Sequence, residues 1–150
     1  MIKSLKALFS KPTAEEEAEI EHQLQLAAAA LLIEMSRADF EVQSEERSAL
    51  EIVLSEALNL SNAEVSELVT LAAAAADRAT SLYEFTRLIN DHYSKPQKLK
   101  LVESMWKVAF ADCDLDKYEE RLIRQVSDLI HVSHSDFIRL KLQVSAETGK

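Results

Sequence analysis

Glycine and proline are almost absent from this chain, and their scarcity constrains the fold more than any motif does. The 150 residues include one glycine and two prolines. Because these residues form most tight turns, a chain nearly without them has little scope for β-hairpins or glycine-rich phosphate loops. Alanine, leucine and glutamate, which favour helices, are abundant instead. We therefore predict an all-α fold, a compact bundle of about seven helices.

The length and composition fit one domain with a packed core. Of the 150 residues, 47% are hydrophobic, which is typical of globular proteins. The longest apolar run ends at Ile33 and is far shorter than the roughly 20 residues that span a bilayer. A single cysteine, Cys113, excludes an internal disulfide and is consistent with a reducing compartment. We expect a cytoplasmic protein whose membrane contact, if any, is indirect or peripheral.

The net charge of −9 is unevenly distributed. Residues 1–11 contain three lysines and no acid, residues 12–75 contain 14 acids and two arginines, and residues 76–150 contain 12 charges of each sign. Nucleic-acid binding requires a basic face, and the acidic first half repels phosphates. We therefore expect no nucleic-acid partner.

Capping boxes indicate where several helices begin, because a Ser or Thr and an acid or amide three residues later bond each other's backbone N–H groups. Thr13–Glu16, Ser61–Glu64 and Ser94–Gln97 have this pattern. Together with apolar periodicity, these signals predict helices that begin near residues 13, 44, 61, 81, 94, 116 and 133. The apolar residues of the first helix recur on a single face that includes Ile20 and Leu24, and we assign Trp106 of the fifth helix to the core.

The sequence repeats itself at an offset of 73 residues. The stretch RADFEVQSEERSALEIV begins at Arg37, and FADCDLDKYEERLIRQV begins at Phe110. The first three helices therefore run parallel in sequence to the last three. We predict a pseudo-twofold repeat of a three-helix unit over residues 13–146, with a short amphipathic segment at 1–12 and a frayed tail at 147–150.

The repeated stretches share the pattern Ala-Asp-x-[Asp/Glu]-[Val/Leu]-x-x-x-Glu, which brings carboxylates from two consecutive helix ends towards one turn. Such a group of oxygen ligands suits a hard divalent cation such as Ca²⁺ or Mg²⁺. The candidate metal ligands are Asp39, Glu41, Glu46, Asp112, Asp114 and Glu119. An alternative is that these acids only cap helices and turns.

The capping hypothesis explains the acids of the second turn better than those of the first. Asp116 can cap the sixth helix with Glu119 as its partner, whereas Gln43 is a poor cap and leaves the first turn without that explanation. An EF-hand is excluded at the second turn, because Lys117 takes the place of the required Gly and Ile123 that of the bidentate Glu. The metal hypothesis and the capping hypothesis both remain open at this point.

No arrangement of residues indicates catalysis. His131 and His134 could begin a zinc site, but other nitrogen and sulfur ligands are scarce. Cys113 lies among carboxylates, which should raise its pKa and reduce its reactivity. We predict no catalytic residues, no bound organic cofactor and no enzymatic activity.

Two basic segments suggest contacts with other surfaces. Residues 1–9 form an amphipathic stretch that either anchors the chain to a membrane or a partner, or docks Leu5, Leu8 and Phe9 on the protein's own core; we favour the second. The fifth helix carries four lysines. They form either a solvated face or a surface for the acidic half of a second copy, which would give a homodimer. These lysines are Lys95, Lys98, Lys100 and Lys107.

The doubled acidic pattern on helix–turn–helix units resembles the TerB-like family of tellurite-resistance proteins, over about residues 20–145. The resemblance implies a compact helical fold, an association with tellurite resistance and stress-response operons, no established enzymatic activity, and a proposed metal-binding role for the acidic loops. The family's Asp and Glu fall on Asp39 and Glu46, and again on Asp112 and Glu119. The family usually has Gly after the Asp, where this chain has Phe40 and Cys113.

Two functional hypotheses follow. In the first, a non-enzymatic TerB-like module binds a divalent cation at its acidic turns and contacts other proteins of a stress-response complex. In the second, the protein is an interaction scaffold without a metal site, and the acidic surface of residues 12–75 contacts a partner.

Overall fold

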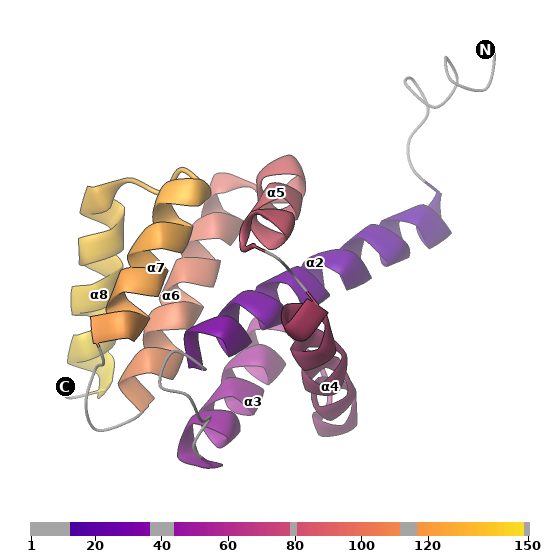
Figure 1. Cartoon of the computed structure of the whole chain (residues 1–150), viewed down its shortest axis with the longest axis horizontal. Helices are drawn as coiled ribbons and strands as arrows, with labels where there is room; N and C mark the ends of the chain where they lie inside the picture. The colour runs from indigo at the N-terminus through magenta and orange to yellow at the C-terminus, as the bar shows by residue number, and fades with distance from the viewer. Residues whose placement is uncertain (1–12, 37–43, 79–80, 112–116, 149–150) are drawn as a thin grey trace.

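The computed structural model describes residues 13–36, 44–78, 81–111 and 117–148, except for the side chains at 35–36, 44–47, 49 and 111. Within these ranges the chain forms seven helices and no strand (Figure 1). They are α2 (Ala14–Ser36), α3 (Ser44–Leu58), α4 (Asn62–Arg78), α5 (Tyr83–His92), α6 (Lys95–Ala111), α7 (Lys117–Leu129) and α8 (His134–Thr148). The predicted all-α bundle is confirmed.

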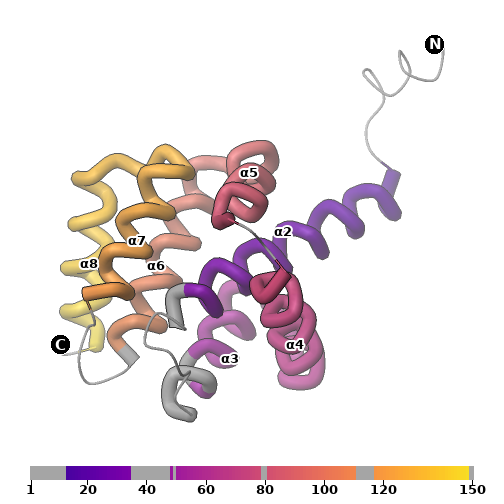
Figure 2. The backbone as a smooth tube through the Cα atoms, viewed as in Figure 1, coloured from indigo at the N-terminus to yellow at the C-terminus, as the bar shows by residue number. Residues whose placement is uncertain are grey.

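The helices are arranged around α2, which crosses the molecule. Helices α6, α7 and α8 lie side by side, whereas α3 and α4 lie on one side of α2 and α5 on the other (Figure 1). The contacts agree: α2 packs mainly against α4 and α5, α6 against α8, and α3 against α6. The first half of α2 projects beyond the other helices, which Figure 2 shows clearly. None of the described helices is long and apolar enough to cross a membrane.

The centre of α2 is buried on every side. All seven residues of Ala27–Ile33 are buried, so the prediction of a single apolar face for this helix was wrong in its middle. The cause is the run of four alanines, whose small side chains let neighbouring helices approach from several directions. In the projecting first half of α2, the predicted single apolar face agrees better with the structure, because Ile20 and Leu24 are half-buried and the residues between them are mostly exposed.

The predicted capping boxes are present in the structure. The Thr13 hydroxyl accepts a bond from the Glu16 N–H, and the Glu16 carboxylate accepts one from the Thr13 N–H, both at 3.2 Å. Ser61 and Glu64 form the same pair. Ser94 and Gln97 begin α6 in the same way, at 2.8 and 3.4 Å. These bonds fix where the helices begin.

The α3–α4 and α7–α8 turns have the same backbone geometry, 72 residues apart. Asn59 follows α3 with φ 55°, and His131 follows α7 with φ 64°. In each turn, the residue after this left-handed position donates its N–H back to a serine carbonyl: Leu60 to Ser55 at 3.2 Å and Val132 to Ser127 at 2.8 Å. Both are Schellman-type helix ends.

Residues that correspond in the repeat also contribute to the same core. Leu50 of α3 and Ile123 of α7 are both almost fully buried, as are Leu32 and Met105. Trp106 is fully buried, as predicted. The structure therefore has equivalent local features in both halves, although the pseudo-twofold symmetry itself remains a prediction.

Candidate functional site

Most of the predicted metal ligands lie outside the described residues. Asp39 and Glu41 fall within 37–43, and Asp112 and Asp114 within 112–116. The backbone of Glu46 lies in the first turn of α3, but its side chain is not described. The structure therefore does not test whether these five side chains lie close together. Of the six candidate ligands, Glu119 is the one whose side chain the structure describes.

Glu119 is buried at the start of α7, with 2% of its surface exposed. It lies four residues before Ile123 and seven before Val126, on the face of α7 that contributes to the core. Removing a carboxylate from water is costly unless charges or hydrogen bonds compensate for the lost hydration. The helix dipole is one source of such compensation, since Glu119 lies in the first turn of α7, where the N-terminal partial charge is positive.

The neighbouring residue, Glu120, points the other way and forms an ion pair. Its carboxylate lies 2.6 Å from the Lys141 ammonium of α8, and both side chains are partly exposed. The Lys141 nitrogen also lies 5.6 Å from the centre of the Trp106 ring, within range of a cation–π contact. Sequence reasoning missed this link between helices, because Glu120 and Lys141 are 21 residues apart and no local spacing predicts the pair.

Trp106 joins the end of α6 to α8 beneath this ion pair. Its ring stacks on Phe110 at 5.7 Å and contacts Phe137 at 5.1 Å. Its Nε1–H is buried and has no acceptor within the described ranges. Because Phe110 lies just before residues 112–116, Trp106 is a natural fluorescent reporter for the second acidic turn.

The histidines proposed for a zinc site are both exposed. His131 is the left-handed residue of the α7–α8 turn, and His134 is the first residue of α8, where its ring contacts Phe137. Among the side chains that the structure places, no three His, Cys, Asp or Glu are grouped closely enough to hold a metal. The zinc hypothesis therefore has no third ligand in the described part of the chain.

The start of α8 carries a perturbed carboxyl group. Hydrogen bonds from the Arg139 side chain and from Ser133 lower the pKa of Asp136 below its ordinary value. The Arg139 guanidinium lies 3.2 Å from Asp136. Ser133 caps α8 by accepting the Asp136 N–H, and the Asp136 carboxylate is held by its own neighbours within the first turn, which is a structural role.

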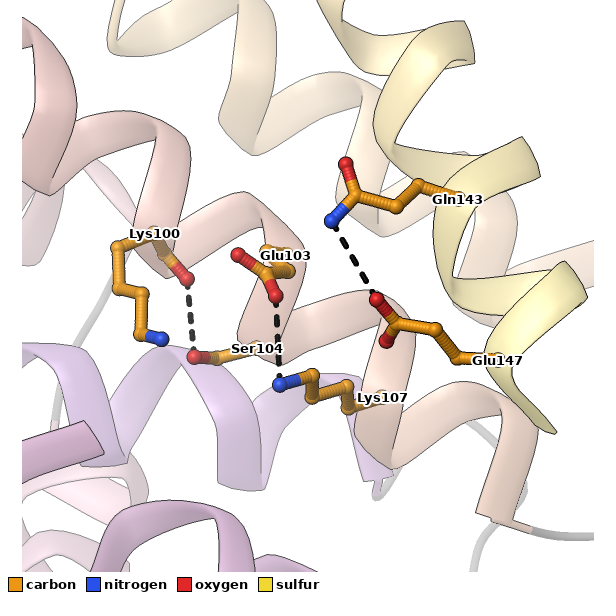
Figure 3. A network of polar contacts seen from close by, with 6 residues as sticks. All are labelled: Lys100, Glu103, Ser104, Lys107, Gln143 and Glu147. Atoms are coloured by element: carbon orange, nitrogen blue, oxygen red, sulfur yellow. Dashed lines mark hydrogen bonds and ion pairs between the residues drawn. The ribbon is translucent and has the colours of Figure 1, made fainter. Parts of the chain in front are cut away.

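The lysines of α6 do not form one continuous surface. Lys107 pairs with Glu103 at 3.3 Å, and the Ser104 hydroxyl donates to the Lys100 carbonyl at 2.9 Å (Figure 3). Gln143 and Glu147 of α8 contact each other nearby. Lys107 is thus engaged within α6, and Lys100, two turns before it on the same side of the helix, has its exposed side chain at a groove. Helical periodicity places Lys95 and Lys98 on the other side of α6.

That groove is a cavity with a volume of about 560 Å³. We call it the α2–α6 groove. Its walls come from α2 between Glu17 and Leu32, the end of α3, the end of α5 and the first half of α6. Its apolar residues are Ile20, Leu24, Ala28, Leu32, Leu54, Ala57, Leu58 and Leu101.

Polar groups lie along the rim of the α2–α6 groove. Glu17 and Glu21 project from α2, and Lys100 from α6. Burial raises the pKa of Tyr93 above its ordinary value, and the negative charge of Glu21 adds to the effect. The groove was missed from the sequence, because its residues come from four helices and share no motif.

Comparison with known protein families matches residues 25–142 to the family described as Tellurite resistance protein TerB. The match covers most of the chain and includes α3 to α7 entirely. Neither the curated proteins nor the solved structures include a match to this chain.

Proposed function

Because the chain belongs to the TerB family of tellurite resistance proteins, we propose that it is a non-enzymatic module that binds a divalent cation at its acidic turns. The observation that carries the proposal is the burial of Glu119 at the start of α7. Burial holds this carboxylate, which is one of the candidate ligands, directly after the acidic residues of the second repeated stretch.

The composition of the second turn supports a hard cation. Asp112, Asp114 and Asp116 precede Glu119 within eight residues. Oxygen ligands of this kind suit Ca²⁺, which takes six to eight oxygens at about 2.3–2.6 Å. The same pattern at Asp39 predicts a second, similar site.

In the cell, we propose that the module acts in tellurite resistance or a related stress response, in the cytoplasm and as part of a protein complex. Cation binding would neutralise the acidic turns and so change which proteins they contact. This mechanism requires no nucleophile or general base, in keeping with the absence of catalytic motifs in the sequence.

A thermal-shift experiment tests the cation site. A cation present at 100 times its dissociation constant should add about 2.7 kcal/mol of stability. We expect Ca²⁺ to raise the melting temperature of the wild-type chain and to change Trp106 fluorescence. Glu119→Gln should weaken both effects, whereas Asp128→Asn, which removes an exposed carboxylate from the same helix, should leave them unchanged. No response to millimolar Ca²⁺, Mg²⁺ or Zn²⁺ would rule out the cation site.

A second candidate function is an interaction scaffold without a metal. The observation that favours it is the exposed acidic surface on the projecting half of α2, formed by Glu15, Glu16, Glu17, Glu19 and Glu21. Such a surface attracts a basic partner at a rate that falls with added salt. Replacing Glu15 and Glu19 with Gln would abolish partner binding under this hypothesis, and would not alter it if the partner contacts the acidic turns.

A further inference from the structure

The surface between α7 and α8 is hollowed and basic, whereas the surface of the projecting half of α2 is acidic. Lys117, Arg121 and Arg124 line the hollow from α7, and His134 lines it from the first residue of α8. All four side chains are exposed. Helices α7 and α8 lie side by side and pack against each other (Figure 1). We call this hollow, with a volume of about 280 Å³, the α7–α8 pocket.

Three cations of the α7–α8 pocket have no ion-pair partner among the described side chains. Glu120 is the one carboxylate among the described residues that line the pocket, and it already lies 2.6 Å from the Lys141 ammonium. Lys117, Arg121 and Arg124 take no part in the ion pairs between described side chains. Within the described ranges the pocket therefore has an excess of positive charge, although the net charge of the chain is −9.

The three cations lie where they oppose the stability of α7. Lys117 and Arg121 are four residues apart, and Arg121 and Arg124 are three apart, so like charges are neighbours on one face of the helix and repel each other. Lys117 also lies in the first turn of α7, where the partial charge of the helix dipole is already positive. An anion bound among these side chains would offset both repulsions.

The residue types in the α7–α8 pocket indicate the class of anion. A guanidinium group presents N–H donors in a planar fork that fits the oxygens of a phosphate. The Cβ atoms of residues three apart on a helix are about 5–6 Å from each other, so Arg121 and Arg124 can contact one phosphate together. Phe137 and Ile138 also line the pocket, and Phe137 is buried. The pocket thus offers apolar contacts beside its cations, which an inorganic ion would not use.

We propose that the α7–α8 pocket binds a small organic phosphate. The guanidinium groups of Arg121 and Arg124 contact the phosphate oxygens, and Lys117 adds positive charge one turn before Arg121. The organic part of the ligand lies against Ile138, which is half-buried. This inference does not depend on cation binding at the acidic turns, because the ligand has the opposite charge and its contacts come from basic side chains.

Amide NMR of the uniformly ¹⁵N-labelled full chain tests the site, with phenyl phosphate as the probe and EDTA present to remove divalent cations. We expect saturable shifts of the Arg121, Arg124 and Ile138 signals and none in the projecting half of α2. Sodium chloride at the same ionic strength should not reproduce them, and equal shifts with chloride would overturn the proposal, since they would report screening alone. Inorganic phosphate should bind the same residues more weakly, and equal affinity would overturn the organic part of the proposal.

A matched pair of substitutions tests which arginine binds the probe. Arg121→Gln should weaken phenyl phosphate binding by about tenfold or more, because it removes charged hydrogen bonds. Arg87→Gln removes the same charge from an exposed position on α5 outside the pocket and should leave the affinity unchanged. Equal affinities for the two variants would contradict the proposal. So would a lower melting temperature of Arg121→Gln with unchanged phosphate binding, which would show that Arg121 has a structural role instead.

Discussion

The two predicted three-helix units, α2–α4 and α6–α8, have similar second helix ends and different first helices. Their second helices both stop at a left-handed residue, Asn59 or His131, followed by a bond back to a serine carbonyl. Their first helices differ in length, because α6 begins at Lys95, which corresponds to His22, whereas α2 already begins at Ala14. Of the eight additional residues of α2, Glu17, Ile20 and Glu21 line the α2–α6 groove.

The comparison distinguishes features that both units share, and that folding requires, from features that occur in one unit alone. The turn geometry and the core positions occur in both units. The start of the unit differs: α6 directly follows the packed helix α5, whereas α2 itself begins with an acidic half that borders a groove. Features specific to one unit, such as the groove and the Glu120–Lys141 pair, are therefore the better candidates for function.

The largest effect is expected in the core, where the two units should respond equally. Leu50→Ala and Ile123→Ala remove equivalent side chains that are no more than 2% exposed. Each should lower the free energy of unfolding by about 2–5 kcal/mol, through lost burial and the cavity left behind. Urea unfolding measures both. Ile52→Ala, at a side chain that is 59% exposed, is the control and should change stability by less than about 0.5 kcal/mol. A clearly unequal loss of unfolding free energy in the Leu50 and Ile123 variants would show that the two units are not equivalent.

The helix caps that follow the two turns should contribute less. Ser61 and Ser133 each accept a bond from the backbone N–H three residues later, at 3.2 and 3.1 Å. Ser61→Ala and Ser133→Ala should each cost about 1 kcal/mol. Chemical denaturation can be compared with Ser135→Ala, an exposed serine inside the first turn of α8, which should have almost no effect. A cost at only one of the two caps would show that the turns are not equivalent.

The left-handed residues should distinguish the two turns. Glycine adopts positive φ without steric cost, and asparagine tolerates it better than histidine does. His131→Gly should therefore stabilise the chain by up to about 1 kcal/mol, after the entropic cost of glycine in the unfolded state, and Asn59→Gly by less. Thermal unfolding measures both, and His131→Ala should give no gain. If Asn59→Gly proved the more stabilising change, the order argued from side-chain chemistry would be wrong.

The smallest effect is confined to the groove and appears at alkaline pH. Because burial and Glu21 raise the pKa of Tyr93 in the folded state, folded chains hold this proton more tightly than unfolded ones. The resulting stability is fully present below the ordinary tyrosine pKa of about 10 and is lost as pH rises through the folded value. Unfolding free energies measured between pH 8 and 11 should fall less steeply for Tyr93→Phe than for wild type. Tyr83→Phe, at a side chain that is 61% exposed, should follow the wild-type curve.

The sequence was sufficient where local chemistry determines structure. The predicted start of a helix near residue 44 is confirmed by α3, and the boxes at Thr13, Ser61 and Ser94 form the bonds expected of them. The acidic pattern also led to the TerB family, which the comparison with known families confirms. Each of these signals lies within a few residues of the feature that it specifies.

Features formed by distant residues could not be predicted in this way. The burial of Ala27–Ile33 on all sides depends on which helices surround α2. The sequence placed Glu119 at a helix start but gave no sign that its side chain would be buried in α7. The environment of Tyr93 depends on α2 and α5 meeting at one groove, and no spacing along the chain encodes that meeting.

The most direct test of the proposed function is a Ca²⁺ titration of the uniformly ¹⁵N-labelled chain, followed by amide NMR. If the acidic turns bind the cation, the amide signals of residues 39–46 and 112–119 should shift in a saturable manner, whereas those of the exposed half of α2 should remain in place. Signals of both turns that stay unchanged up to millimolar Ca²⁺, or shifts that follow exposed acids throughout the chain, would contradict it.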